Sequence, residues 1–491
     1  MPFHNMKYFW IAGAFFGIVF TVLLSIRLDL LHKIFPVSQN TPLSPISTGV
    51  ARDTWMNVFQ SGRKIGYSHT RFTKEGKGYH LHETLFMRIN TMDMIHDINL
   101  STEGLLNSDF TLAAFDFQLS SGLFGFGAKG SISGNVLSVT TQSSGGSKTF
   151  DIQIKNKPYL AAGIVDVVRG AGLKQSDPLT FNVFDPATMG QEPVVVKVIG
   201  EQEILNMGTL KRATVLSLRF KGITQRAWLG KNGEVLKEEG LLGLSLEKTT
   251  PEEALYGRPI EPSRDLTKVA SIPSNVRITR SESLETLKVE ISGIPHEHID
   301  LDGGRQTFKN NILTIHKESL SNLPSRFDPS DFQTIPKKYI MASPFIQSDH
   351  PKIRDLTRQI VPEDDAPVAK VQKLVAWLQN NIEKRPVISL PDALATLENR
   401  VGDCNEHAVL LTAFARAAGI PCTVETGLVY LKGRFYYHAW NLVYLGRWIT
   451  VDSLFGQIPA DVTHIRFSGG TPEQQLDLMQ IIGKVRLKII P

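Results

Sequence analysis

One cysteine near the C-terminal end of the chain stands in a setting that favours nucleophilic chemistry. Asp403 and Glu406, three residues apart on either side of Cys404, have the spacing of a capping box, which predicts that a helix begins at this cysteine. Gly419 and Pro421 predict where that helix ends. A thiol in the first turn of a helix lies near unpaired backbone N–H groups and the positive end of the helix dipole, which stabilise a thiolate. Cys404 is therefore a candidate nucleophile, because an inert cysteine more often sits in mid-element among large apolar residues.

A base and its orienting carboxylate are predicted on two strands that follow this helix. The stretch FYYHAWNLVY contains His438, and RWITVD ends at Asp452. The intervening residues 444–446 fit a three-residue hairpin loop with Gly446 in the left-handed position. With that loop, His438 lies directly opposite Asp452 on the same face of the hairpin. An imidazole beside a carboxylate is the arrangement of a general base and the group that orients it.

Helices predicted upstream complete an α+β domain around these residues. An apolar stripe with helical spacing lies between Pro367 and Pro386 and comprises Val371, Leu374, Val375, Leu378 and Ile382. A second, short helix is predicted after Asp392, with Leu394 and Leu397 turned inward. We assign residues 335–491 to this catalytic domain.

The segments around the three residues resemble the transglutaminase-like superfamily. The matching stretches are GDCNEHA, GIPCTVETGLVY, YYHAWN, WITVD and the tail GQIPADVTHIRF. They cover residues 340–470, about a quarter of the chain. The resemblance implies a papain-like α+β core in which Cys404, His438 and Asp452 form a triad that performs acyl transfer on amides.

The resemblance also implies roles for these residues. Cys404 would attack an amide carbonyl, His438 would protonate the leaving amine and then activate the acceptor, and Asp452 would hold the imidazole tautomer. The backbone N–H of Cys404 is the natural first oxyanion donor, and Asn399 is a candidate for the second. No cofactor and no metal is predicted, and the expected partner is a peptide or protein amide substrate.

The reaction itself is left open by the residues. We favour peptide or amide hydrolysis. This preference rests on the resemblance to bacterial members of the family and not on any single residue. The alternatives are protein-glutamine gamma-glutamyltransferase (cross-linking) activity and a non-catalytic module that holds a peptide in the same cleft.

Five further polar or aromatic residues near the motif are assigned mainly structural roles. His407 shares a helix face with the nucleophile, but a base on that helix could not easily reach both the thiol and the leaving group. Cys422 is expected to be an inert packing residue, with a redox partner of Cys404 as the alternative. Trp440 is expected to cover the core. Gln457 and His464 are candidates for the rim of the cleft.

The chain upstream is predicted to be rich in β structure. Short alternating strands separated by turn signals indicate a large antiparallel β domain over residues 54–262, in which Gly134-Asn135 and Asn232-Gly233 fit two-residue hairpin turns. A smaller β-rich subdomain is predicted over residues 265–330. His80 and His82 share a strand face, but the sequence offers no third metal ligand beside them. The sequence does not indicate which ligand the β domain binds. A partner in the cell envelope is one candidate.

The N-terminus carries an apolar segment. Residues 8–26 are uncharged and would span roughly 28 Å as a helix, close to the thickness of a bilayer core. A cleaved signal peptide fits less well, because the segment is long and no small-x-small site follows. We therefore predict an N-terminal membrane anchor (1–34) and a Pro/Ser/Thr-rich linker (35–53). The predicted location is the cell membrane, single-pass, with the N-terminus inside and the catalytic domain extracytoplasmic.

Composition excludes several classes of protein. The chain has 491 residues, of which 42% are hydrophobic and 21% charged, so it is neither disordered nor collagen-like. A net charge of +5 without a basic cluster does not predict nucleic-acid binding. Two cysteines are too few for a disulfide framework. The predicted fold class is thus α+β: a papain-like, transglutaminase-like core preceded by a large antiparallel β domain and a transmembrane helix.

Overall fold

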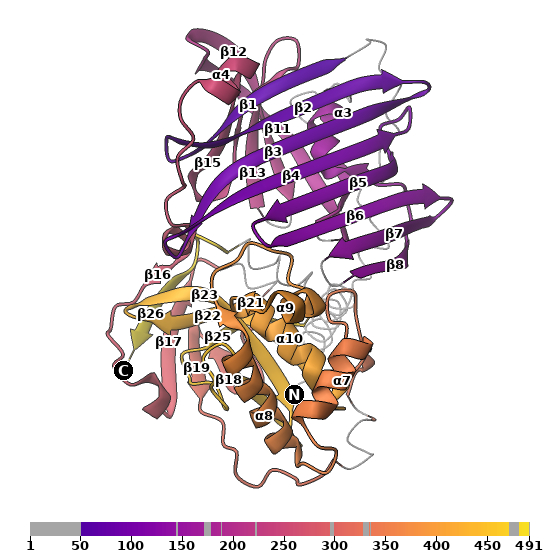
Figure 1. Ribbon diagram of the computed structural model, residues 1–491. Coiled ribbons are helices and arrows are strands. Elements are labelled where there is room, and N and C mark those ends of the chain that lie inside the picture. Colours follow the sequence, from indigo (N-terminus) through magenta and orange to yellow (C-terminus); the bar gives the residue numbers. More distant parts are fainter. Residues whose placement is uncertain are drawn as a thin grey trace, which may run out of the picture. The chain divides into compact units, whose positions relative to one another are not determined.

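The computed structural model describes residues 51–143, 146–170, 178–187, 189–220, 223–294, 299–327, 333, 335–470 and 481–490 (Figure 1). All of them belong to one compact unit, residues 44–491. The predicted anchor (1–34) and most of the predicted linker lie outside the described residues. Within the described ranges, no helix combines the length and the apolar character that crossing a membrane requires. The predicted transmembrane helix, single-pass topology and extracytoplasmic location are therefore unsupported, and we correct them.

The predicted α+β fold class is also wrong, because the structure is mostly β: 50% of the described residues lie in strands and 18% in helices. Fifteen strands form one large sheet, and further sheets flank the helices of the C-terminal part. Among the residues that the structure describes, the longer helices lie within residues 351–417.

In the large sheet, neighbouring strands run from β8 back to β1 and continue from β15 back to β9. All neighbours pair antiparallel except β9 and β10. The strands are β1 (Arg52–Gln60), β2 (Arg63–Glu75), β3 (Gly78–Thr91), β4 (Met94–Leu106), β5 (Leu112–Ser121), β6 (Phe124–Ser133), β7 (Val136–Ser143), β8 (Gly146–Gln153), β9 (Tyr159–Leu160), β10 (Leu179–Asp185), β11 (Gly190–Asn206), β12 (Thr209–Phe220), β13 (Ile223–Leu229), β14 (Val235–Glu239) and β15 (Leu244–Thr249).

Turn chemistry and aromatic packing shape this sheet. Ser133 pairs with Val136, which confirms the two-residue turn at Gly134-Asn135. The second predicted turn is wrong: Leu229 pairs with Val235, so the loop there spans residues 230–234. The rings of Phe115 on β5 and Phe184 on β10 lie with centroids 5.1 Å apart, so strands distant in the sheet order pack against each other.

Short helices accompany the large sheet and the segments that connect it to the rest of the chain. They are the α-helices α3 (Ile164–Gly170), α4 (Pro251–Tyr256) and α5 (Leu266–Ala270) and the 3-10 helices η1 (Ala161–Gly163), η2 (Leu241–Gly243), η3 (Ser281–Ser283) and η5 (Lys337–Tyr339).

Two smaller sheets form the C-terminal part. One has the order β16-β23-β22-β25, with β24 paired to β23, and the other has the order β18-β19-β17-β26. A two-stranded sheet pairs β20 with β21. The strands are β16 (Ile272–Pro273), β17 (Thr286–Ser292), β18 (Gln306–Lys309), β19 (Ile312–His316), β20 (Glu383–Lys384), β21 (Val401–Gly402), β22 (Cys422–Leu431), β23 (Arg434–Tyr444), β24 (Trp448–Val451), β25 (Ile465–Gly470) and β26 (Arg486–Ile490).

The segment predicted as a small β-rich subdomain shares its core with the C-terminal part. One cluster of buried side chains unites Val289 and Ile291 of β17 with Leu428 and Phe435 of the β22–β23 pair. The strand at the C-terminal end, β26, also pairs with β17. Residues 286–316 therefore help to support the sheet on which the candidate site lies.

Four helices pack near that sheet: α7 (Pro351–Ile360), α8 (Pro367–Asn381), α9 (Ala393–Asn399) and α10 (Cys404–Ala417) (Figure 1). The predicted stripe of α8 is buried, and so are Leu394 and Leu397 of α9, which confirms both helices. Completely buried Ala413 and Ala415 contribute to the core between α10 and the sheet. Small side chains there let α10 approach the strands closely and bring its first turn to β23.

Candidate functional site

The start of α10 places Cys404. Asp403 is the N-cap, and its carboxylate accepts the backbone N–H of Asn405 at 3.0 Å. Glu406 completes the capping box by accepting the backbone N–H of Asp403 at 3.0 Å. Gly419, at φ +76°, follows the end of the helix. The predicted boundaries of this helix are confirmed, and they fix Cys404 in its first turn.

The thiol of Cys404 lies against β23. The backbone N–H of Ala439, which directly follows His438 on that strand, lies near enough to the sulfur to favour its thiolate form. Cys404 keeps part of its surface exposed, whereas His438 is buried. The helix terminus thus brings Cys404 to the part of β23 that carries His438.

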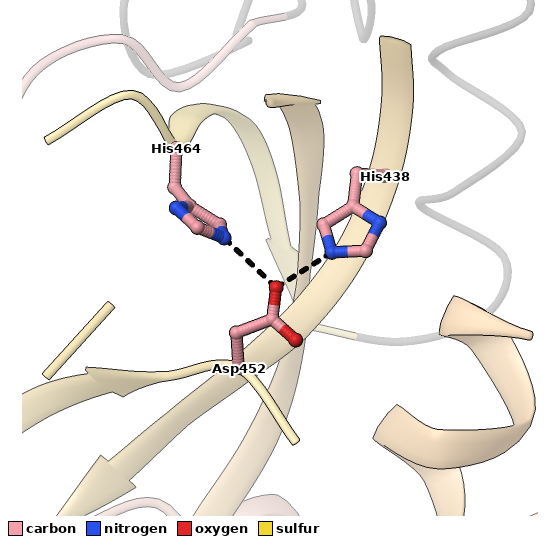
Figure 2. Close-up of side chains that lie close together, drawn as sticks. All are labelled: His438, Asp452 and His464. Atoms are coloured by element: carbon pink, nitrogen blue, oxygen red, sulfur yellow. Dashed lines mark hydrogen bonds and ion pairs between the residues drawn. The ribbon is translucent and has the colours of Figure 1, made fainter. Parts of the chain in front are cut away.

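His438 and Asp452 are hydrogen-bonded. His438 Nε2 lies 2.7 Å from Asp452 Oδ2, and both side chains are almost completely buried (Figure 2). Because Nε2 is committed to the carboxylate, Nδ1 is the ring nitrogen that is not bonded to Asp452.

The hairpin register differs from the predicted one by a single loop residue. Tyr444 pairs with Trp448, so the loop comprises residues 445–447 with Gly446 at its centre. Leu445 is completely buried, which draws this residue out of the predicted loop tip and into the core.

In the observed register, β24 ends at Val451 and Asp452 forms an isolated bridge with Gln457. His438 and Asp452 therefore meet diagonally rather than directly opposite. Their predicted placement on one face is right, because shifting the loop by one residue changes the pairing by two positions and preserves the alternation of faces.

Burial and nearby charges shift the pKa values of Cys404 and Asp452 in opposite directions. Burial raises the pKa of the Cys404 thiol well above its usual value, the Asp403 carboxylate adds to this, and the Ala439 N–H opposes it. This is contrary to the thiolate that the helix terminus alone predicted. Burial alone would raise the pKa of Asp452, but the charges and hydrogen bonds of His438 and His464 outweigh it and hold that pKa well below its usual range. The resting site therefore holds a neutral thiol and an ionised carboxylate.

Two residues of the loop after β24 complete the surroundings of His438. The ring of Phe455 stacks on the imidazole, and its backbone N–H donates to Asp452 Oδ1 at 2.9 Å. His464, predicted at the cleft rim, is instead completely buried, and its Nε2 lies 2.8 Å from Asp452 Oδ2. The sequence signal for His464 was present in the tail GQIPADVTHIRF, but Phe455 had none, because its contact depends on how the loop folds back.

Three of the other candidate residues, Cys422, His407 and Trp440, are buried and have structural surroundings. Cys422 is completely buried, and burial raises its pKa to about 11. His407 is completely buried, with Nδ1 2.8 Å from the backbone oxygen of Asp403, and its Nε2 has no hydrogen-bond partner among the described residues. Trp440 is buried and donates its indole N–H to Glu425 at 2.9 Å.

The last candidates are Asn399 and Gln457. Asn399 ends α9. Gln457 exchanges two backbone hydrogen bonds with Asp452, at 3.0 and 2.9 Å, so its main chain helps to hold the carboxylate-bearing residue.

A cavity of about 520 Å³ adjoins the site. Its lining includes Asp403 beside the thiol, Phe455 on the imidazole, and the polar side chains of Gln457 and Asp461. Its described lining includes neither Cys404 nor His438, so the cavity lies beside the thiol and the imidazole.

His438, Asp452 and His464 could also be examined as metal ligands, since their ligand atoms lie within 4.8 Å of one another. A tetrahedral zinc ion with bonds of ~2.0–2.1 Å would hold its ligand atoms roughly 3.3 Å apart. The nitrogen–oxygen distances of 2.7 and 2.8 Å are shorter and suit direct hydrogen bonds. We therefore assign these contacts as hydrogen bonds.

The segment that carries Cys404, His438 and Asp452 matches a known protein family. Residues 354–453 match the family model of the transglutaminase-like superfamily core. No curated protein matches the chain.

Two solved structures are similar at low identity. A candidate cysteine protease from Cytophaga hutchinsonii is 18% identical, with 42% of this chain and 81% of that one covered and a TM-score of 0.27. A β-barrel-like protein of a domain of unknown function from Brucella abortus is 10% identical, with 41% and 96% covered and a TM-score of 0.33. At these TM-scores neither likeness carries an argument about function.

Proposed function

Since this chain carries a domain of the transglutaminase-like superfamily, a superfamily of thiol enzymes, we propose that it cleaves amide bonds through Cys404, His438 and Asp452, with water as the acceptor. The observation that carries the proposal is the buried hydrogen bond of 2.7 Å between His438 Nε2 and Asp452 Oδ2, beside a thiol in the first turn of α10.

The reaction begins from a neutral thiol. His438 Nδ1 takes the proton of Cys404 as the sulfur attacks the amide carbonyl, and the developing oxyanion accepts the backbone N–H of Cys404. The imidazolium then gives this proton to the leaving amine as the C–N bond breaks, which leaves a thioester on the sulfur. Asp452 stabilises the imidazolium and fixes the tautomer that can act.

Water completes the cycle. The neutral His438 takes a proton from water, the hydroxide attacks the thioester carbonyl, and the carboxylic acid leaves as the thiol is regenerated. Because burial raises the pKa of Cys404, proton transfer to His438 accompanies attack, and no stable thiolate needs to exist beforehand.

The test is an assay that distinguishes the acceptors. The purified protein is incubated with dimethylated casein and a fluorescent primary amine, and both incorporated amine and newly formed acid or peptide ends are measured. Hydrolysis without amine incorporation supports the proposal. Amine incorporation would identify a transferase instead.

Cys404→Ala and Cys422→Ala serve as matched controls, because only the first removes the proposed nucleophile. Turnover that survives in Cys404→Ala would overturn the proposal. Binding of the casein without turnover in any variant would favour a non-catalytic module.

A further inference from the structure

A second histidine binds the carboxylate that orients His438. His464 Nε2 lies 2.8 Å from Asp452 Oδ2, the same oxygen atom that lies 2.7 Å from His438 Nε2 (Figure 2). All three side chains are buried. A carboxylate oxygen has two lone-pair sites, so it can accept from both rings at once.

The partners of His464 require hydrogen on both of its ring nitrogens. Nδ1 lies 3.2 Å from the backbone oxygen of Asp461 and 3.3 Å from Asp461 Oδ1. These atoms and Asp452 Oδ2 are all acceptors, whereas a neutral imidazole has only one N–H to donate. Burial alone would lower the pKa of His464, but its bonds to Asp452 and Asp461 outweigh burial and raise it. The contacts therefore favour the imidazolium form.

Asp461 is held in place independently of His464. Its Oδ1 accepts the backbone N–H and the hydroxyl of Thr463 at 2.9 and 2.6 Å, and its Oδ2 accepts from Gln457 Nε2 at 3.1 Å. Burial would raise the pKa of Asp461, but the hydrogen bond and charge of His464, together with the side chain of Thr463, hold that pKa well below its usual range. A fixed anion thus stands behind the ring on the side opposite its contact with Asp452.

The other charged groups close to His464 pair with one another. Five charged residues line, together with His464, a cavity of about 540 Å³: Arg305, Lys317, Glu318, Glu425 and Arg466. Arg305 lies 3.6 Å from Glu318, and Arg466 lies 3.6 Å from Glu425. Arg305 also donates to the backbone oxygen of His464 at 3.2 Å. Lys317 lies 3.2 Å from Glu285, so each of these cations has a carboxylate partner. The carboxylates that contact the ring of His464 itself are Asp452 and Asp461.

We propose that His464 is a positioning residue of the catalytic site: a buried imidazolium that holds Asp452 and draws part of its negative charge away from His438. This inference rests on the proposed function. The two imidazole rings have centroids 5.8 Å apart, so a charge on His464 opposes a charge on His438. His438 consequently releases its proton to the leaving amine more readily than it would beside Asp452 alone.

The test is the titration of His438 in the full chain, followed by NMR with ¹³C-labelled histidine and assigned with His438→Gln. In His464→Gln, the glutamine can still donate to Asp452 but carries no charge. The midpoint of His438 is expected to rise by about one pH unit or more, and the acidic limb of the kcat/KM profile, which reports the neutral base, is expected to move to higher pH with it. An unchanged midpoint in a folded variant would overturn the proposal and leave His464 a structural role.

A second variant keeps the ring and removes the anion behind it. Asp461→Asn is expected to lower the titration midpoint of His464 itself, while Asp355→Asn, an exposed aspartate on α7, is expected to leave it unchanged. An unchanged His464 midpoint in Asp461→Asn would contradict the proposal even if His464→Gln failed to fold. Because these titrations do not depend on turnover, they separate this inference from the proposed function: the expected shifts in a protein without turnover would refute only the latter.

Discussion

The ring of Phe455 lies on the imidazole of His438, with centroids 5.0 Å apart and 15° between the ring planes. The same residue donates its backbone N–H to Asp452 Oδ1 at 2.9 Å. Phe455 is itself 39% exposed, so it stands between the proposed base and solvent. One residue therefore covers the imidazole and, through its main chain, helps to hold the carboxylate that orients it.

Replacing this ring should impair turnover more than folding. Phe455→Ala keeps the backbone bond to Asp452 but removes the stacking contact, which is worth about 0.5–1.5 kcal/mol. We expect kcat to fall by up to about tenfold with little change in thermal stability, because the side chain is partly exposed. Tyr256→Ala, at a residue 84% exposed, is the control aromatic truncation. An unaltered kcat would show that the stack has no role in catalysis.

Replacing each of the two cysteines should affect turnover very differently. Cys404→Ala is expected to abolish turnover with the fold intact, since the residue is partly exposed at a helix terminus. Cys422→Ala is expected to keep most of the turnover and to lose roughly 1 kcal/mol of stability, because its sulfur is completely buried. Steady-state rates and thermal unfolding of both variants check this. Equal loss of activity in both, with both folded, would indicate a coupled redox pair.

The raised pKa of Cys404 makes a prediction about its reactivity. Without substrate, the rate of alkylation by iodoacetamide should still increase with pH above 9, the ordinary value for a thiol, because burial and Asp403 disfavour the thiolate. Mass spectrometry of the Cys404 peptide gives the rate at each pH. A plateau reached below pH 7 would instead show a preformed thiolate–imidazolium pair.

Asp452 should be needed for the reaction and for part of the stability. Asp452→Asn cannot accept from two imidazoles as a carboxylate does, so we expect turnover to fall by about 10²-fold or more. Stability should fall by roughly 1–3 kcal/mol, because buried His464 loses its charged partner. Ser453→Ala, one residue further along, should change turnover little. Comparable loss of turnover in both variants would point to a disturbed loop rather than a missing carboxylate.

His464 should also change how the free energy of unfolding depends on pH. Its pKa is raised on folding, so its contribution is fully present below the unfolded value of about 6.5 and is lost as pH rises through the folded value. The difference in unfolding free energy between the original protein and His464→Gln should therefore shrink as pH rises above about 6.5. Denaturant melts over a pH series measure this difference. A difference that grew with pH would mean that His464 is buried as the neutral form.

Local sequence signals were enough to predict the elements that position the site. The capping box at Asp403 and the glycine at Gly419 bounded α10 correctly, because caps and left-handed glycines act within a few residues. Alternation along the hairpin placed His438 and Asp452 on one face even though the loop was displaced by one residue. Burial of Leu445 in the core displaced it, which no loop preference could reveal.

What the sequence could not predict depends on the packing of distant segments. His464 lies after a loop that folds back over β23, so its bond to Asp452 exists only once the chain returns. The pKa of Cys404 was predicted in the wrong direction because the helix terminus is a local feature, whereas desolvation comes from everything packed around the thiol. The fold class was misjudged because the extent of the large sheet outweighs the helices of the C-terminal part.

The most direct measurement of the central claim is covalent trapping by a substrate-like electrophile. The folded protein is treated with a peptidyl chloromethyl ketone, and the adducts are mapped and timed by mass spectrometry in the original protein and in His438→Gln. The account predicts one adduct, on Cys404, that forms at least about tenfold more slowly when His438 is replaced. Equal labelling of Cys404 and Cys422, or a rate at Cys404 that does not depend on His438, would contradict it.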